Sequence, residues 1–301
     1  MNMPSDFLQP QERCGYRVTA EMKAVWAVEM TLLERFDAVC RQHGLTYFAG
    51  GGTLLGAVRH GGFIPWDDDV DLFMPRRDYD RLLAVGDAAF VPPCFLQTAY
   101  NDVNYSRGHA QLRMDGTTAI LEGEWGRYTF HQGIFIDIFP LDAIPDERAA
   151  QLAQRRRLAR WNRLLAATVR YPGSPHKTPL KTAVHRVLSI VPYRWLYRRM
   201  ERECRRYENT PTRRVGLLSF EPQSDRWVMP RKCFAGTAHL PFEYTKIPVP
   251  LDFDAILTAA YGDYLTPRQD PAYHAGAFFD PHRDYREYLR KEPTDGTRES
   301  L

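Results

Sequence analysis

The sequence predicts a protein of the α/β or α+β class, and three observations support this. In the first half of the chain, short strand-like segments alternate with stretches whose apolar residues recur every three or four positions, as on one face of a helix. The second half begins with two long helical stretches that are rich in arginine. The composition, 44% hydrophobic and 26% charged over 301 residues, is typical of a globular chain that can bury a core.

The first elements surround a run of glycines. Apolar residues at helical spacing predict a helix over 18–43, and Gly44 is expected to end it. Residues 46–49 are expected to form a short strand, and the sequence Gly-Gly-Gly-Thr at 50–53 turns into a second helix over 54–59. The order strand, glycine turn, helix lets the backbone approach a ligand, and the helix N-terminus favours an anion such as phosphate.

Further elements follow from the same patterns. Alternating polar and apolar residues predict a strand over 69–72 that continues to residue 74. The other expected elements of the chain are a helix over 77–86, strands over 94–98, 110–114 and 133–139, long helices over 146–170 and 179–208, and a helix over 253–261. Asp146 is a candidate N-cap of the first long helix.

Composition and cysteine usage narrow the class of protein. The five cysteines are scattered, with no Cys-x-x-Cys motif, so neither a disulfide framework nor a structural zinc site is expected. The first residues lack a cationic start followed by an apolar stretch, and nowhere do 18 apolar residues run together. We expect a cytoplasmic protein in a reducing compartment, without a membrane span, that could rest peripherally on the inner face of the membrane.

A cluster of aspartates is the strongest chemical signal. Asp67, Asp68, Asp69 and Asp71 lie within five positions, and the two-residue period of a strand puts Asp69 and Asp71 on one face. Like charges this close repel, so the arrangement is expected to surround a cation, and carboxylate oxygens favour Mg²⁺ or Mn²⁺. Asp137 lies in a strongly apolar stretch, and a buried carboxylate is costly unless it is paired, hydrogen-bonded or bound to metal.

Each acidic residue also has a structural interpretation. The cluster could be a solvated loop, although its apolar neighbours, such as Trp66 and Val70, are typical of packed structure. Asp137 could bond to the backbone at a strand end. Asp142 follows Pro140 and Leu141 and is better explained by such a structural role.

Two stretches resemble a known family. The sequences GGTLLGAVRHGGFIPWDDDVDLFMPRRDY and HQGIFIDIFPLD are similar to signature blocks of the LicD-type phosphocholine transferases, relatives of the fukutin-type glycan phosphotransferases. A third stretch, IPVPLDFDAILTAAYGDYLTPRQDPAYH, is similar to the family's closing block. The resemblance implies an α+β nucleotidyltransferase fold like that of DNA polymerase β, a mixed sheet flanked by helices, here with an added basic helical segment.

The resemblance also implies a division of the chain. We expect a nucleotidyltransferase-like catalytic core at 1–146, a basic helical insertion or subdomain at 147–214, a C-terminal part at 215–291 that completes the catalytic domain, and a disordered tail at 292–301.

The resemblance assigns roles residue by residue. Gly51, Gly52 and Thr53 match the turn that holds the donor phosphates, and Asp69 and Asp71 match the metal-binding pair. Asp137 matches the third carboxylate, which binds metal or accepts the proton of the attacking hydroxyl. Asp67 belongs to the acidic pattern and is a possible metal ligand, and Arg59 matches a phosphate contact. Where the family pattern has Lys-x-Arg, this chain has Gln111-Leu112-Arg113, so Arg113 is expected to carry the charge alone.

The implied activity is a metal-dependent transfer of phosphocholine, or a similar alcohol phosphate, from a CDP-linked donor such as CDP-choline. The acceptor would be a hydroxyl of a cell-surface glycan, lipopolysaccharide or teichoic acid. Aromatic faces bind quaternary ammonium groups, and aromatic residues near the site in sequence are candidates for such a cage: Tyr105, Trp125, Tyr128 and Phe130. Two alternatives stay open: a nucleotidyltransferase that uses a nucleoside triphosphate, and a non-enzymatic scaffold on a glycan or membrane.

The near-neutral net charge of +3 hides two regions of opposite character. Residues 148–214 hold 18 Lys or Arg and three acidic residues, a net charge of +15, so the rest of the chain carries −12. The arginines fall partly at helical spacing between apolar residues, a pattern typical of helices that rest on an anionic membrane. A solvated face that pairs with the acidic remainder is an equally good interpretation, and nucleic-acid binding ranks last.

Overall fold

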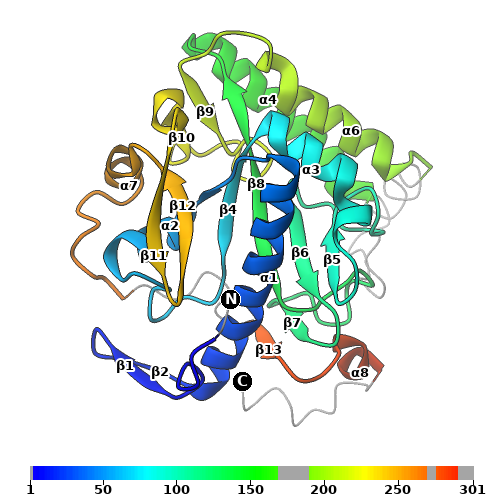
Figure 1. The fold of residues 1–301 in the computed structure, drawn as a ribbon. Coiled ribbons are helices and arrows are strands. Elements are labelled where there is room, and N and C mark those ends of the chain that lie inside the picture. The colour runs from blue at the N-terminus through cyan, green and yellow to red at the C-terminus, as the bar shows by residue number, and fades with distance from the viewer. Residues whose placement is uncertain (1–2, 169–189, 270–275, 291–301) are drawn as a thin grey trace.

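A seven-stranded mixed sheet forms the centre of the molecule (Figure 1). The computed structural model describes residues 3–168, 190–269 and 276–290. The strands of the sheet are β3 (Phe48–Ala49), β4 (Asp71–Pro75), β5 (Cys94–Gln97), β6 (Ala110–Met114), β8 (Phe135–Ile144), β9 (Arg214–Gly216) and β10 (Val228–Pro230).

Strand β8 organises this sheet. It pairs in parallel with β4, and it pairs antiparallel with β6 through its first half and with β9 through its second half. All ten residues of β8 are buried, because strands cover both of its edges and helices and loops cover its faces. The expected α+β architecture with a mixed sheet flanked by helices is confirmed. The nucleotidyltransferase fold and the proposed domain limits stay predictions.

The helices that flank the sheet begin and end close to the predicted positions. α1 (Ala20–His43) begins after Thr19, whose hydroxyl accepts a hydrogen bond from the Met22 amide at 3.2 Å, and it ends at Gly44 with a φ of +58°. α1 passes in front of β6 and β8 in Figure 1 and buries Trp26 and Phe36 in the core. The other helices on this part of the molecule are α2 (Gly51–Arg59), α3 (Arg76–Ala89), α7 (Phe253–Tyr261) and α8 (Tyr285–Arg290).

Short hairpins and turns complete this half. The hairpins are β1 (Gln11–Arg13) with β2 (Tyr16–Val18) and β11 (Thr237–Phe242) with β12 (Thr245–Pro250). β7 (Thr118–Ile120) pairs with the distant β13 (Phe278–Asp280), and the 3₁₀ turns are η2 (Arg231–Phe234) and, after the basic segment, η1 (Arg205–Tyr207).

Three boundaries near the site differ from the sequence-based expectation. The glycines form the first turn of α2 rather than a separate turn before it, so residues 51–53 already lie in the helix. Strand β4 begins at Asp71, two residues later than predicted, so Asp69 lies in the extended segment that leads into the strand. Strand β8 runs through Pro140 and ends at Ile144, because β4 and β9 continue to pair with it there.

The basic segment forms two antiparallel helices, α4 (Arg148–Thr168) and α6 (Tyr193–Cys204), which lie side by side in Figure 1. The Gln154 side chain donates to the Glu203 carbonyl at 3.0 Å, and Trp161 packs edge-on against Trp195. Asp146 accepts a hydrogen bond from the Arg213 amide at 2.9 Å, which ties the start of α4 to the segment before β9. The prediction of one helix over 179–208 is wrong in its described part: residues 190–192 form a turn, α6 begins after Pro192, and a 3₁₀ turn follows it at 205–207. Residues 179–189 and the tail from 292 lie outside the described residues.

A buried ion pair joins α3 to the end of β8. The Arg76 guanidinium donates to both carboxylate oxygens of Asp142, at 2.6 and 2.9 Å, and both side chains are at most 1% exposed. Asp142 thus has a structural role, as predicted, but through an ion pair with a side chain rather than through a bond to the backbone.

Within the described part of the chain, no helix is both long enough and apolar enough to cross a membrane.

Candidate active site

The glycines of α2 allow two carboxylates to approach the N-terminus of the helix. Gly51 has a φ of +48°, and a Cβ atom there would lie 2.2 Å from the Asp71 carboxylate. A Cβ atom on Gly52 would lie 2.4 Å from the carboxylate of Asp67. Because any side chain at either position would displace a carboxylate, the glycines are required by the close packing of the acidic groups against the helix start.

Strand pairing brings the three predicted metal ligands together. In the parallel pair of β4 and β8, Asp71 lies directly opposite Asp137, and Asp69 precedes Asp71 by two residues. One carboxylate oxygen from each of these three residues lies within 4.8 Å of the others. Three oxygen ligands at this spacing could hold a divalent cation such as Mg²⁺ or Mn²⁺.

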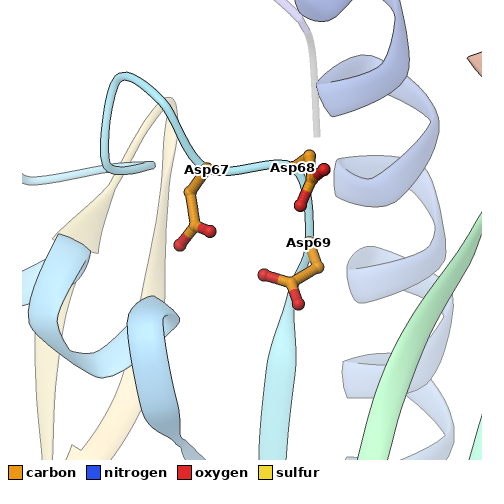
Figure 2. Close-up of side chains that lie close together, drawn as sticks. All are labelled: Asp67, Asp68 and Asp69. Atoms are coloured by element: carbon orange, nitrogen blue, oxygen red, sulfur yellow. The ribbon is translucent and has the colours of Figure 1, made fainter. Parts of the chain in front are cut away.

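A second acidic group shares one residue with the first. Asp67, Asp68 and Asp69 also offer oxygen atoms within 4.8 Å of one another. Figure 2 shows the three side chains along the segment that enters β4, with Asp68 beside α1. Asp69 therefore belongs to both groups, and the structure places Asp67 next to the predicted ligands, as the acidic pattern suggested.

Burial makes the negative charges of this cluster costly. Burial first, and then the charges of Asp71 and Asp68, raise the pKa of Asp67 to about 7. Glu29 on α1 is 1% exposed, and burial, followed by the charges of Asp69 and Asp68, raises its pKa well above the usual range. A bound cation would lower the cost of ionising these groups, so the arrangement fits a metal better than it fits a solvated acidic loop.

Neighbouring strands hold Asp137 in place. Gln111, its partner residue on β6, donates a hydrogen bond from Nε2 to Asp137 Oδ1 at 2.7 Å. The ring of His109 is 4% exposed, with Nε2 2.9 Å from the same oxygen, and burial lowers the pKa of this histidine. The Gln111 amide therefore orients one oxygen of Asp137, and the His109 ring lies beside the same oxygen.

Three other predicted residues have different positions. Arg113 is fully buried and does not line the cavity; its guanidinium donates to the Gln111 side chain at 2.5 Å and to the Gly133 carbonyl at 2.6 Å. Arg113 thus supports Gln111 rather than contacting a phosphate directly. The Thr53 hydroxyl is also buried and accepts a hydrogen bond from the Asp71 amide at 2.8 Å. Arg59 does line the cavity and donates to the Tyr264 carbonyl at 2.9 Å.

A cavity of about 780 Å³ opens over the carboxylates. Its walls include the two glycines of α2, Asp67, Asp69, Asp71 and Asp137, together with residues of α4 and of the C-terminal part. Four arginines also line it: Arg59, Arg107, Arg226 and Arg268. The volume lies in the range of roughly 300–1,000 Å³ that small-molecule sites occupy, and carboxylates beside arginines suit a ligand that carries both metal and phosphate.

The aromatic residues that line this cavity are not those that the sequence predicted. The four predicted cage residues pack elsewhere: Tyr105 against Phe130, Tyr128 also against Phe130, and Trp125 against Phe278. The aromatic residues that do line the cavity are Trp66, Phe73, Phe139, Phe220, Trp227, Tyr261 and Tyr264. Residues next to them in sequence, such as Arg107 and Leu121, do line the cavity, but these four side chains pack against other rings instead.

Several residues near the carboxylates were not predicted. Tyr261 lies in the Tyr-Gly-Asp-Tyr stretch, so a sequence signal for it existed. Arg226 has its guanidinium 4.7 Å from the Tyr261 ring centre and 5.1 Å from that of Trp227, a contact that joins two distant segments. No local pattern marks Glu29, His109 or Arg226, since only the packing of α1, β6 and the C-terminal part brings them to the site.

Comparison with known proteins agrees with this geometry. Residues 44–157, which carry the glycines and all the acidic groups except Glu29, match the family described as LicD/FKTN/FKRP, nucleotidyltransferase domain. The chain is 28% identical over 254 residues to a Haemophilus influenzae protein named lipopolysaccharide cholinephosphotransferase LicD, an alignment that covers 81% of this chain and 92% of the relative.

A short stretch is similar to animal proteins. The human and mouse proteins named ribitol 5-phosphate transferase FKRP are each 66% identical to this chain over 29 residues, which is 10% of this chain and 6% of the relative.

Proposed function

Because the chain contains a LicD family domain, we propose that it transfers phosphocholine, or a similar alcohol phosphate, from a CDP-linked donor to a hydroxyl of a cell-surface glycan. The observation that carries this proposal is the convergence of Asp69, Asp71 and Asp137 on one cavity beside a glycine-rich helix start. The relative of known name acts on lipopolysaccharide, so lipopolysaccharide or teichoic acid is the proposed class of acceptor.

Asp69, Asp71 and Asp137, with Asp67 beside them, would hold one or two divalent cations, Mg²⁺ or Mn²⁺. A bound cation would neutralise the donor's pyrophosphate oxygens and the charge of the departing nucleotide. The N-terminal amides of α2 at Gly51 and Gly52 would bind the phosphate oxygens, and Arg59 or Arg226, which also line the cavity, would contact them.

The remaining step is the transfer itself. The acceptor hydroxyl oxygen attacks the phosphorus that carries choline, and the bond from this phosphorus to the bridging oxygen breaks, so CMP leaves. Asp137 takes the hydroxyl proton, because the Gln111 amide fixes one of its oxygens and the carboxylate lines the cavity. No covalent intermediate on a side chain is required.

An aromatic wall next to Asp137 would select choline. Phe139 lies two residues after Asp137 on β8, so both side chains are on the same face of the strand, and Phe220 packs against Phe139 with 4.9 Å between ring centres. A quaternary ammonium is attracted to such rings. Phe139→Ala and Phe220→Ala should therefore raise the KM for CDP-choline more than the KM for CDP-glycerol or CDP-ribitol.

The decisive test is the product formed. Purified protein is incubated with Mg²⁺, lipopolysaccharide or teichoic acid and each of three donors, CDP-choline, CDP-glycerol and CDP-ribitol, and CMP is quantified. Acceptor-dependent CMP release that is lost in Asp71→Asn and retained in Asp284→Asn supports the proposal. Release of pyrophosphate from CTP with a hydroxyl acceptor would identify a nucleotidyltransferase instead. Absence of both products, with no binding of Mg²⁺ or CDP-choline by calorimetry, would favour a scaffold.

A further inference from the structure

The surface of α4 and α6 that faces away from the sheet combines arginines with apolar residues. We call it the basic face and define it by these exposed residues: Arg156, Arg160, Arg163, Arg194, Arg198, Arg202, Leu152, Leu164, Ile190 and Trp195. On α4 they recur at positions three and four apart, so they share one side of the helix, and the same holds for the arginines of α6.

The arginines beside the basic face form ion pairs with acidic residues, and these pairs balance part of the positive charge of residues 148–214. Arg155 forms an ion pair with Asp225 at 2.5 Å, and Arg157 and Arg206 both pair with Glu203, at 2.7 Å each. Arg205 pairs with Asp80 at 2.8 Å. Pairing with the acidic remainder of the chain therefore explains these four arginines.

The six arginines of the basic face have no acidic partner among residues 3–168, 190–269 and 276–290. One of the six, Arg198, lies over the Tyr100 ring at 5.9 Å, and its neighbour Arg199 lies over the Trp195 ring at 4.8 Å. The face thus presents a block of positive charge that the protein itself leaves to solvent or to a partner.

Apolar side chains interrupt this positive charge. Trp195 is 45% exposed, Ile190 is 80% exposed, and Leu152 and Leu164 are 39% and 36% exposed. These four make up a large share of the exposed large apolar residues in the described chain, and all lie on α4, on α6 or just before α6. A partner that gains from contacting them must offer an apolar layer next to its negative charge.

The basic face also adjoins the cavity. Asn162, Leu165 and Ala166 of α4 and Met200 of α6 line the cavity, and Ala166 is itself exposed at the surface of α4. A large partner that rests on the basic face would therefore lie at the rim of the cavity.

From charge, apolar exposure and position together, we propose that the basic face docks the protein on an anionic phospholipid bilayer. The arginines contact lipid phosphates, while Trp195 and the aliphatic side chains enter the boundary between headgroups and acyl chains. Nucleic acid would match the charge but offers no hydrocarbon layer to the leucines and Ile190. This docking does not depend on the proposed transferase activity, since neither donor nor acceptor takes part.

The test measures binding of the full chain to vesicles by co-sedimentation. Vesicles of phosphatidylcholine alone are compared with vesicles that contain about 30% phosphatidylglycerol, at two salt concentrations. We expect binding to the anionic vesicles only, weakened at high salt because the lipid charge is screened. The variant R156Q/R160Q/R163Q should bind the anionic vesicles at least tenfold more weakly.

A matched control removes the same charge elsewhere. R17Q/R77Q/R214Q changes three exposed arginines on β2, α3 and β9 and should bind within twofold of the unchanged protein. Both variants should keep the midpoint of thermal unfolding, which shows that they fold. Equal binding by the two variants, no binding to anionic vesicles, or a loss of RNA binding without a loss of vesicle binding would overturn the proposal.

Discussion

The acidic cluster and the basic face both crowd like charges, but they do so in opposite surroundings. Asp68, Asp69 and Asp137 are buried, at 5–7% exposure, in a sheet and beneath a helix start. The arginines of the basic face are exposed on the surfaces of two helices. Water and salt screen charges on such a surface, whereas buried carboxylates repel one another strongly. Crowded charge thus supports the proposed cation in the first region and the proposed docking surface in the second.

The largest expected effect is a loss of activity on substitution in the buried acidic cluster. Asp71→Asn keeps the shape of the side chain and removes one negative charge opposite Asp137. Acceptor-dependent CMP release should fall at least about 10³-fold, because several kcal/mol of charge stabilisation in the transition state is lost. The thermal midpoint should stay unchanged or rise, since repulsion between carboxylates decreases. Asp284→Asn, at an exposed turn, is the control, and comparable losses in both variants would contradict a special role for Asp71.

The second prediction concerns a buried charge that is paired. Arg76→Ala leaves Asp142 buried without its counter-charge, so the free energy of unfolding should fall by about 3–5 kcal/mol. Urea unfolding measures this change. The neighbouring residue provides the control: Arg77→Ala removes an exposed guanidinium and should change the same free energy by less than about 0.5 kcal/mol. Similar losses in the two variants would show that the ion pair is not what stabilises this junction.

The third prediction separates backbone strain from contact with the carboxylates. Gly51→Ala combines a left-handed backbone with a Cβ atom 2.2 Å from Asp71 Oδ2, so CMP release should fall about 10–100-fold. Gly116→Ala has the same kind of backbone, with a φ of +74°, but nothing within 4 Å of its Cβ. It should lose about 1 kcal/mol of stability and keep its activity. Equal activity of the two variants would contradict the proposed role of Gly51.

The smallest effect concerns acid stability. His131 accepts a hydrogen bond at Nδ1 from the Gly133 amide, and burial first, then the charge of Arg113, lowers its pKa. The folded state therefore binds the proton less readily than the unfolded state, so this contribution to stability is present above the ordinary histidine pKa of about 6.5 and is lost as the pH falls through it. The advantage of the unchanged protein over His131→Gln should shrink by up to about 1 kcal/mol between pH 7.5 and 5.5.

Urea unfolding at both pH values measures that advantage. His239→Gln, which changes an exposed ring, serves as the control substitution. A constant advantage for His131 across this range would mean that the histidine is protonated in the folded protein as easily as in the unfolded chain.

Local patterns predicted much of the fold. The helix α1, the strand β6 and the helix α7 have the expected limits within two residues, because periodic apolar residues and end signals such as Gly44 act over short distances. The end of β8 was missed because a proline usually ends a strand, whereas here β4 and β9 keep the strand paired beyond Pro140.

Some residues of the candidate site were likewise predicted from local sequence, and others were found only in the structure. The sequence alone marked the glycines, Asp67, Asp69, Asp71 and Asp137, since the residue types and their spacing carry the chemistry. Their convergence depends on the register of two strands that are distant in sequence, with Asp71 opposite Asp137. The aromatic wall, the roles of Gln111 and Arg113, and the burial of Glu29 were decided by the tertiary structure, because packing between distant segments determines which side chains face the cavity and which charges lose their contact with water.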